Sequence, residues 1–275
     1  MNPYDLTSIG RPIDPEYPTN RAIALITLMV AVGGAVWRGV SGRAWLASVL
    51  WGVQAGLAVF LAWALCRELD PDHPAAAFPA AGLALLAVFL WDLPQLGVIF
   101  WMLILARVVN RSTGLPAGVL DSLGLLGLAG WLSLQGDWGY GFVTALAFLL
   151  DALLPDRLRR QLAFALLAVI VTAAAAALGN GFPGDAPSLT GGLIALALSL
   201  VFFPVIHEAR TCESVGDETG ERLSPVRVQA AQALVLVSGV AAALAGGPTA
   251  LAALSPLWAA TLGAATTWLF STLTA

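Results

Sequence analysis

Four side chains that can bind a hard metal ion or carry a proton lie within one six-residue stretch of the chain. They are Glu68, Asp70, Asp72 and His73. Carboxylate oxygens together with one imidazole suit Mg²⁺ or Mn²⁺, and two nearby prolines would stiffen the loop. The spacing lacks the glycine and the closing glutamate of an EF-hand, and an acidic turn that caps the next helix also explains it. The stretch therefore predicts either a divalent-metal site or a solvated turn.

A second group combines two guanidiniums with an amide. Arg107, Asn110 and Arg111 share one face of a helix through their i, i+3, i+4 spacing. Together with the hydroxyls and amides that follow them, two guanidiniums can hold a phosphate or a carboxylate. The alternative is that both arginines extend to anionic lipid headgroups. The group predicts either an anion-binding site or a lipid contact.

Two carboxylates, Asp121 and Asp151, lie within or at the edge of apolar runs. An ionisable group inside a membrane helix is costly and usually faces a cavity or a partner. One interpretation is an internal salt bridge with Arg107 or Arg111. The other is a relay for protons or cations, in which case Asp121→Asn should abolish transport and leave the fold intact.

Several common catalytic arrangements do not occur in the sequence. All 13 basic residues are arginine, which excludes Schiff-base and P-loop lysine chemistry, and the two cysteines are far apart, so they predict no zinc knuckle or redox pair. His207 and Glu208 end an apolar run, where the histidine can carry a proton or interact with the helix dipole. There is no Ser/His/Asp set, no dinucleotide-binding glycine motif and no paired Asp-rich motif.

The amino-acid composition indicates whether these residues belong to a soluble protein or to a membrane protein. Of the 275 residues, 59% are hydrophobic and 11% are charged, and the mean hydropathy is +0.83. Soluble chains have about 45–50% apolar and about 25% charged residues. A soluble enzyme, a disordered protein and a nucleic-acid binder, which needs a basic patch, are therefore excluded. The main partner of this chain is the lipid bilayer.

The apolar runs predict an all-α, polytopic bundle of about ten transmembrane helices. A crossing needs roughly 20 residues, with about 17–25 tolerated. The expected crossings are 22–37, 44–66, 75–91, 93–109, 115–134, 138–154, 161–178, 189–206, 226–245 and 251–273. The runs 75–91 and 93–109 count as two crossings only if the chain turns back in a tight hairpin at Trp91–Pro94. We expect this hairpin because proline disfavours a helical conformation in the residue before it.

The arginines support this count. Loops that stay in the cytoplasm carry an excess of basic residues, and with ten crossings only Arg38 and Arg43 fall on the other side. Both termini are then cytoplasmic. Residues 1–21 contain four prolines and no apolar core of a cleaved signal, so they predict a cytoplasmic tail. Residues 22–275 form a single transmembrane domain, which we expect in a bacterial inner (plasma) membrane.

Three functions are compatible with these patterns. The first is a transporter or translocator of a small anionic or lipid-linked substrate, with Asp121 and Asp151 as proton or cation sites. The second is a membrane-embedded enzyme that transfers a group on a lipid, with a divalent metal at Glu68–His73 and a cytoplasmic-facing site. The third is a structural subunit of a homo- or hetero-oligomeric complex. The Gly52-x-x-x-Gly56 step would serve packing inside the bundle or a dimer face.

Overall fold

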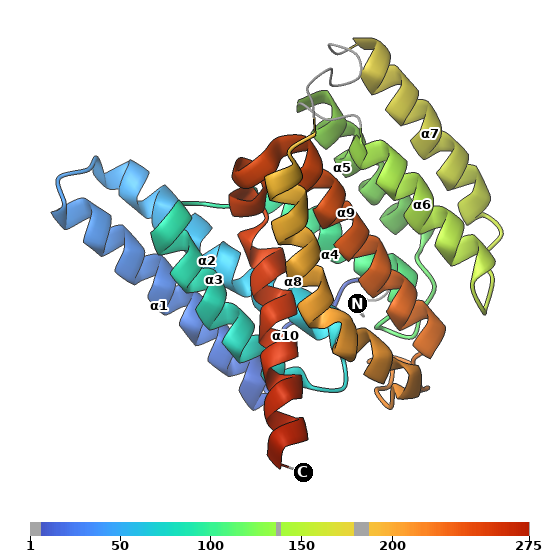
Figure 1. Cartoon of the computed structure of the whole chain (residues 1–275), viewed down its shortest axis with the longest axis horizontal. Coiled ribbons are helices and arrows are strands. Elements are labelled where there is room, and N and C mark those ends of the chain that lie inside the picture. Colours follow the sequence, from blue (N-terminus) through green and yellow to red (C-terminus); the bar gives the residue numbers. More distant parts are fainter. Residues whose placement is uncertain (1–6, 136–138, 179–186, 275) are drawn as a thin grey trace.

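The computed structural model describes residues 7–135, 139–178 and 187–274. These residues form ten α-helices and two short 3-10 helices, so the all-α prediction is confirmed (Figure 1). The helices are α1 (Pro18–Val40), α2 (Trp45–Leu69), η2 (Pro74–Ala76), α3 (Ala77–Trp91), α4 (Leu96–Asn110), α5 (Val119–Gln135), α6 (Gly139–Leu153), α7 (Gln161–Leu178), α8 (Leu189–Glu208), η3 (Ala209–Thr211), α9 (Pro225–Ala253) and α10 (Ser255–Thr274).

The predicted break at Trp91–Pro94 separates α3 from α4, but the two helices make little contact with each other, unlike the arms of a tight hairpin: α3 packs on α2 and α10, and α4 packs on α2 and α9. Asp92 ends α3 with a φ of 69° and a ψ of −162°, a backbone conformation that residues other than glycine rarely adopt. Its Oδ1 accepts a hydrogen bond of 2.8 Å from the indole Nε1 of Trp51. Asp92 therefore serves as a turn residue that is tied to α2, as the sequence indicated.

The end of α9 differs from the prediction. The apolar run was expected to stop at Ala245, but α9 continues to Ala253 across a kink at Gly247, whose φ is 63° and ψ is −147°. This backbone conformation is accessible mainly to glycine, and Pro248 then starts the next turn with its fixed φ. The predicted break is thus a bend between two consecutive helical segments.

Among the residues that the structure describes, six helical segments are long and apolar enough to cross a membrane: Pro18–Val40, Trp45–Leu69, Pro74–Trp91, Gln161–Leu178, Leu189–Thr211 and Pro225–Ala253. The helices α4, α5 and α6 have 15, 17 and 15 residues. At 1.5 Å per residue they are shorter than a hydrocarbon core of about 30 Å. The chain is therefore a multi-pass membrane protein, and the full count of ten crossings stays a prediction.

Small residues let α1 and α2 approach closely. A Cβ atom on Gly52 would lie 2.2 Å from the carbonyl oxygen of Ala31, and one on Gly56 would lie 2.7 Å from that of Thr27. The Gly52/Gly56 step therefore packs helices inside this bundle. Figure 1 shows α1, α2 and α3 on one side, α5, α6 and α7 on the other, and α4 and α9 between them.

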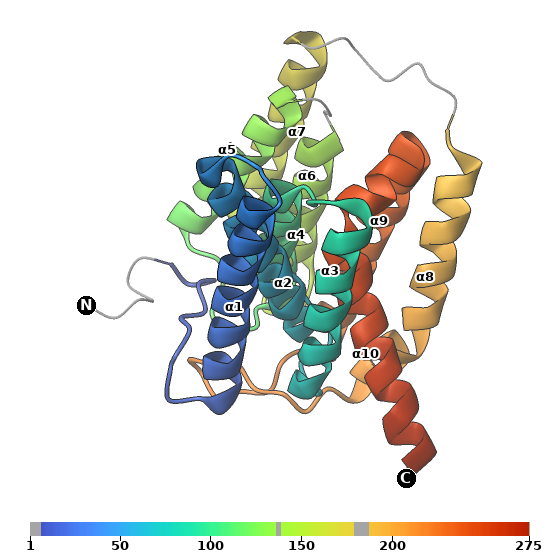
Figure 2. The ribbon, with the colours of Figure 1, turned by 90° about the vertical axis from the view of Figure 1, so that its left-hand side faces the viewer.

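The connections that carry most of the arginines meet at one end of the bundle, which we call the polar end. It comprises residues 7–17, 70–73, 111–118, 154–160 and 209–224. In Figure 2 the connection from α8 to α9, drawn in orange, runs across this end towards the start of α1. Hydrogen bonds join the segments, for example from Thr113 Oγ1 to the Ser8 carbonyl at 2.6 Å. The cytoplasmic location of this end stays a prediction.

Candidate functional site

Glu68, at the end of α2, is the centre of a buried ion-pair network. Its side chain is 0% exposed, and its Oε1 accepts hydrogen bonds from Arg11 Nη1 at 3.1 Å and from Arg107 Nε at 3.0 Å. Its Oε2 accepts a third bond from Asn110 Nδ2 at 3.1 Å. Arg107 and Asn110 both project from α4, as their spacing predicted. The acceptor of both is the Glu68 carboxylate, whereas Arg111, the third member of the predicted group, pairs with Asp151, so the three side chains do not share one anion.

Arg11 joins three segments of the polar end. Besides Glu68 it contacts Asp217 through two hydrogen bonds, from Nε to Oδ2 at 2.5 Å and from Nη2 to Oδ1 at 2.9 Å. Burial lowers the pKa of Arg11, but the carboxylates of Glu68 and Asp217 outweigh burial, and the pKa is raised above its usual value. The guanidinium therefore stays charged and bridges residues 7–17, α2 and the 209–224 connection.

Asp121, in the first turn of α5, anchors the N-terminal segment. Its Oδ1 accepts a hydrogen bond from Thr7 Oγ1 at 2.6 Å, and its Oδ2 accepts bonds from the Ser8 hydroxyl at 2.7 Å, the Ser8 amide at 3.0 Å and the Gly118 amide at 2.9 Å. The predicted arginine partners do not contact it. Residues 7–17 are therefore docked across the polar end.

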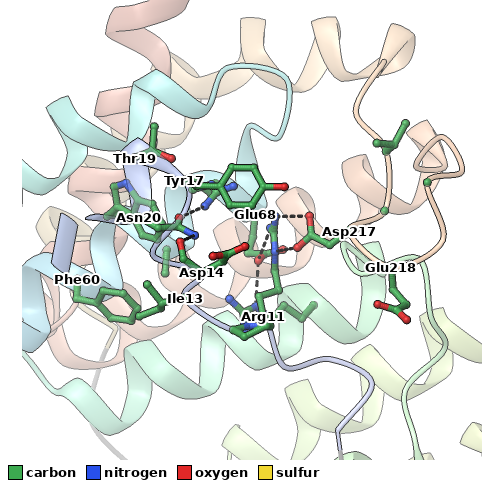
Figure 3. Close-up of a pocket in the computed structure, with 18 residues that line it drawn as sticks. Arg11, Ile13, Asp14, Tyr17, Thr19, Asn20, Phe60, Glu68, Asp217 and Glu218 are labelled. Atoms are coloured by element: carbon green, nitrogen blue, oxygen red, sulfur yellow. Dashed lines mark hydrogen bonds and ion pairs between the residues drawn. The ribbon is translucent and has the colours of Figure 1, made fainter. Parts of the chain in front are cut away.

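A cavity of about 490 Å³ lies beneath this docked segment, between the start of α1, the end of α2 and residues 215–220 (Figure 3). One wall is formed by Arg11, Asp14 and Glu68, and the aromatic rings of Phe60 and Trp63 lie deeper in the bundle. The cavity thus combines charged groups at the polar end with apolar surface between two membrane helices.

Arg67 is the distinctive cation of this cavity. Its guanidinium lies 4.8 Å from the centroid of the Trp63 ring and donates a hydrogen bond of 3.3 Å to Asn20 Oδ1. Within the described ranges, no carboxylate oxygen lies within 4.0 Å of it, whereas Arg11 and Arg107 are both paired with Glu68. Arg67 therefore presents a positive charge to the cavity without a direct counter-ion. The sequence analysis did not single it out, although it directly precedes Glu68.

A second buried network joins α4, α6 and α9 away from the cavity. Oδ1 of Asp151 accepts hydrogen bonds from Arg111 Nη2 at 2.7 Å and from Arg227 Nη1 at 2.8 Å. The three side chains are 0%, 10% and 2% exposed, respectively. The expected salt bridge between Asp151 and Arg111 is therefore present. Arg227 was missed, although an arginine at the start of an apolar run was the available signal.

The four predicted metal ligands do not share one site, because Glu68 lines the large cavity whereas Asp70, Asp72 and His73 line a smaller one. Glu68 contacts arginines, His73 Nδ1 lies 3.0 Å from Asp70 Oδ1, and Asp72 accepts hydrogen bonds from the backbone amides of Glu213 at 3.1 Å and Ser214 at 2.8 Å. Across the part of the chain that the structure describes, no three His, Cys, Asp or Glu side chains are grouped to hold a metal ion. By themselves, these four residues do not form one site.

The carboxylates of this stretch also differ in their electrostatics. Burial raises the pKa of Asp70 to about 6, although its hydrogen bond with His73 acts to lower it. Burial acts to raise the pKa of Asp72 as well, but the hydrogen bonds from Ser214 and Glu213 outweigh it and hold the pKa below its usual value. Asp72 is therefore a charged cap for the 209–224 connection.

The contacts of Asp121 lead to a first prediction. Asp121→Asn replaces one acceptor oxygen by an amide NH₂ group, which faces donors on Ser8 and Gly118. We expect amide hydrogen exchange of residues 7–10 to accelerate about tenfold, since a charge-assisted hydrogen bond is worth about 1.5–3 kcal/mol. Mass spectrometry of the N-terminal peptide measures this. Exchange at the wild-type rate would show that Asp121 does not hold the segment.

Comparison with models of protein families, with curated proteins and with solved structures gives no match. The argument about function therefore depends on the geometry of this chain. That geometry defines a multi-pass membrane protein with two buried charge networks and, at its polar end, a large cavity with both charged and apolar walls.

Proposed function

We propose that the protein is a transporter or translocator that takes up an anionic or lipid-linked substrate in the cavity at the polar end. The observation that carries the proposal is Arg67, whose guanidinium lines the cavity while the carboxylates of Glu68 and Asp217 are already occupied by Arg11. An unpaired guanidinium is a ready partner for a phosphate or a carboxylate.

The other cavity walls narrow the class of substrate. Phe60 and Trp63 supply apolar surface between α1 and α2, which suits the chain of a lipid. Asp14 and Glu218 also line the cavity, and their carboxylates would repel a multiply charged anion. We therefore expect a substrate with a single negative charge, such as a phosphodiester, attached to an apolar group.

The coupling carboxylates stay part of the proposal. Asp121 suits a proton or cation site better than Asp151 does, because its partners are neutral hydroxyls and amides. Oδ1 of Asp151 is already bound by two buried guanidiniums, which leaves less room at that oxygen for a proton or a cation. The enzyme alternative would need the predicted metal ligands to meet at the cavity, and of those four only Glu68 lines it.

Substitution of Arg67 tests the function. The protein is reconstituted in phosphatidylcholine vesicles with a trace of fluorescent phosphatidylglycerol, whose headgroup carries one phosphodiester charge. We expect wild-type protein to move the probe between leaflets, which dithionite quenching measures, and to retain phosphatidylglycerol in native mass spectrometry. Arg67→Gln should weaken retention about tenfold or more, since a charge-assisted hydrogen bond is worth about 1.5–3 kcal/mol.

Arg43→Gln is the matched control, because Arg43 is exposed in the connection between α1 and α2, outside the cavity. It should leave both measurements unchanged. A parallel binding experiment with inorganic phosphate separates a free anion from a lipid headgroup. Equal retention of the lipid by wild type and Arg67→Gln would contradict the proposal, and so would a wild-type protein that moves no probe.

A further inference from the structure

A second, much smaller cavity lies at the polar end. Its volume is about 10 Å³, and it lies between the connection after α2, the end of α8 and α9. Asp70, Glu208 and Gln232 line it, and it shares no lining residue with the large cavity. A cavity of this volume has room for about one particle the size of a water molecule.

Three oxygen atoms on the lining residues have no hydrogen-bond partner within the described residues. They are Asp70 Oδ2, Glu208 Oε2 and Gln232 Oε1, and all three atoms are buried. Asp70 is 4% exposed and Gln232 is 0% exposed. A buried acceptor without a partner is unfavourable, and such groups are rare in folded proteins. Three of them around one small cavity indicate that a ligand belongs there.

The remaining polar atoms of these residues fix their orientation. Gln232 Nε2 donates a hydrogen bond of 2.6 Å to the Leu69 carbonyl, so a flipped amide would place two acceptor oxygens against each other. Asp70 Oδ1 contacts His73 Nδ1 at 3.0 Å. The Cys212 thiol faces Asp72 at 3.5 Å, and backbone amides already bind Asp72. The His73 imidazole also lines the cavity, with its Nε2 4.0 Å from Glu208 Oε1, and the buried side-chain atoms without a partner there are all oxygens.

The chemistry of three unpaired oxygens selects the ligand. A water molecule has two hydrogens to donate, so it would leave one acceptor unpaired. Oxygen ligands suit hard cations. Two carboxylates, one of which also faces the His73 imidazole, match the charge of a monovalent ion better than that of Mg²⁺ or Ca²⁺, which are usually bound with several waters or by six to eight oxygen ligands. We propose that this cavity binds one Na⁺ ion through Asp70, Glu208 and Gln232. The donor set is two carboxylates and one amide oxygen. It is therefore compatible with the absence, among the described residues, of any group of three His, Cys, Asp or Glu side chains that could hold a metal ion.

The site is independent of the proposed function and has its own experiment. Full-length protein in a non-ionic detergent is moved from choline chloride to NaCl at constant ionic strength and pH. We expect Na⁺ to raise the thermal unfolding midpoint, because a ligand that binds only the folded state stabilises it. Equilibrium dialysis with ²²Na⁺ should give one ion per chain. KCl and MgCl₂ should give a smaller shift than NaCl.

Gln232→Leu keeps the volume of the side chain and removes its oxygen, and we expect at least tenfold weaker ²²Na⁺ binding. Gln229→Leu is the matched control, because Gln229 Nε2 also donates a bond of 2.7 Å to a carbonyl, that of Ile206, from the same helix. It should bind Na⁺ as the wild type does. The Glu208 side chain is 40% exposed. Glu208→Gln is therefore a second variant in which we expect weaker Na⁺ binding, for use if Gln232→Leu does not fold.

Three results would overturn the site. Wild-type protein without Na⁺ binding and without a midpoint shift would show that the cavity holds only water. A larger shift with Mg²⁺ than with Na⁺ would rule out the monovalent ion. Equal loss of binding in Gln232→Leu and Gln229→Leu would show that the glutamines act only by holding the helix.

Discussion

Asp151→Asn is expected to destabilise the folded protein by about 3–5 kcal/mol, the range for removing one partner of a buried ion pair. Oδ1 of Asp151 accepts hydrogen bonds from Arg111 and Arg227, and these side chains are only 10% and 2% exposed. The asparagine cannot balance two buried positive charges. Arg227 would keep its bonds to the carbonyls of Val109 and Pro155, but those bonds supply no charge.

Thermal unfolding followed by tryptophan fluorescence measures the loss, since the chain has 10 tryptophans. Glu221→Gln is the control, because Glu221 is an exposed carboxylate in the 209–224 connection, outside the network of Asp151, Arg111 and Arg227. It should unfold at the wild-type midpoint. A shift of the same size in both variants would show that the Asp151 network contributes no more than a surface carboxylate.

The helices could be predicted from the sequence because each apolar run is bounded by polar residues or proline. α7 (Gln161–Leu178) was expected with the same bounds, and the break between α3 and α4 followed from Pro94. Gly247 shows the limit of this reasoning. A Gly-Pro step indicates a change of direction, but the pattern does not distinguish a kink from a loop.

The pairing of charges was harder to predict. Arg107 and Arg111 were the two partners expected for Asp151 if it formed a salt bridge, and the structure pairs it with Arg111, 40 residues away in the sequence. Arg11 and Asp217 are 206 residues apart, and each lies in a segment without periodicity. Every carboxylate at the polar end has several arginines within reach of its connection, so only the packed structure decides between them. The docking of residues 7–17 onto the polar end could not be predicted for the same reason.

The small cavity shows a related limit. Asp70 was singled out from its acidic stretch, but Glu208 and Gln232 come from helices more than a hundred residues further along the chain. Gln232 looks like an ordinary polar residue in an apolar helix. Its unpaired oxygen becomes significant only because its amide nitrogen is bound to the Leu69 carbonyl.

Glu68→Gln is expected to weaken the fold and strengthen anion binding at the same time. Glu68 is 0% exposed and is paired with Arg11 and Arg107, both of which line the large cavity. Removal of its charge should destabilise the protein by about 3 kcal/mol or more. Arg11 keeps its pair with Asp217, but Arg107 loses its carboxylate partner, so that Arg107 joins Arg67 in presenting positive charge to the cavity.

Phosphatidylglycerol retained in native mass spectrometry should therefore rise several-fold in Glu68→Gln, while the unfolding midpoint falls. The opposite signs matter, because a variant that is merely damaged would lose both stability and binding. Combination with Arg67→Gln completes the experiment: the double variant should keep the low midpoint and lose the additional lipid, since Arg67 is the cation that no carboxylate within 4.0 Å pairs among the described residues. If Glu68→Gln instead binds less lipid than the wild type, the cavity does not recognise anions through its arginines, and the proposed substrate class is wrong.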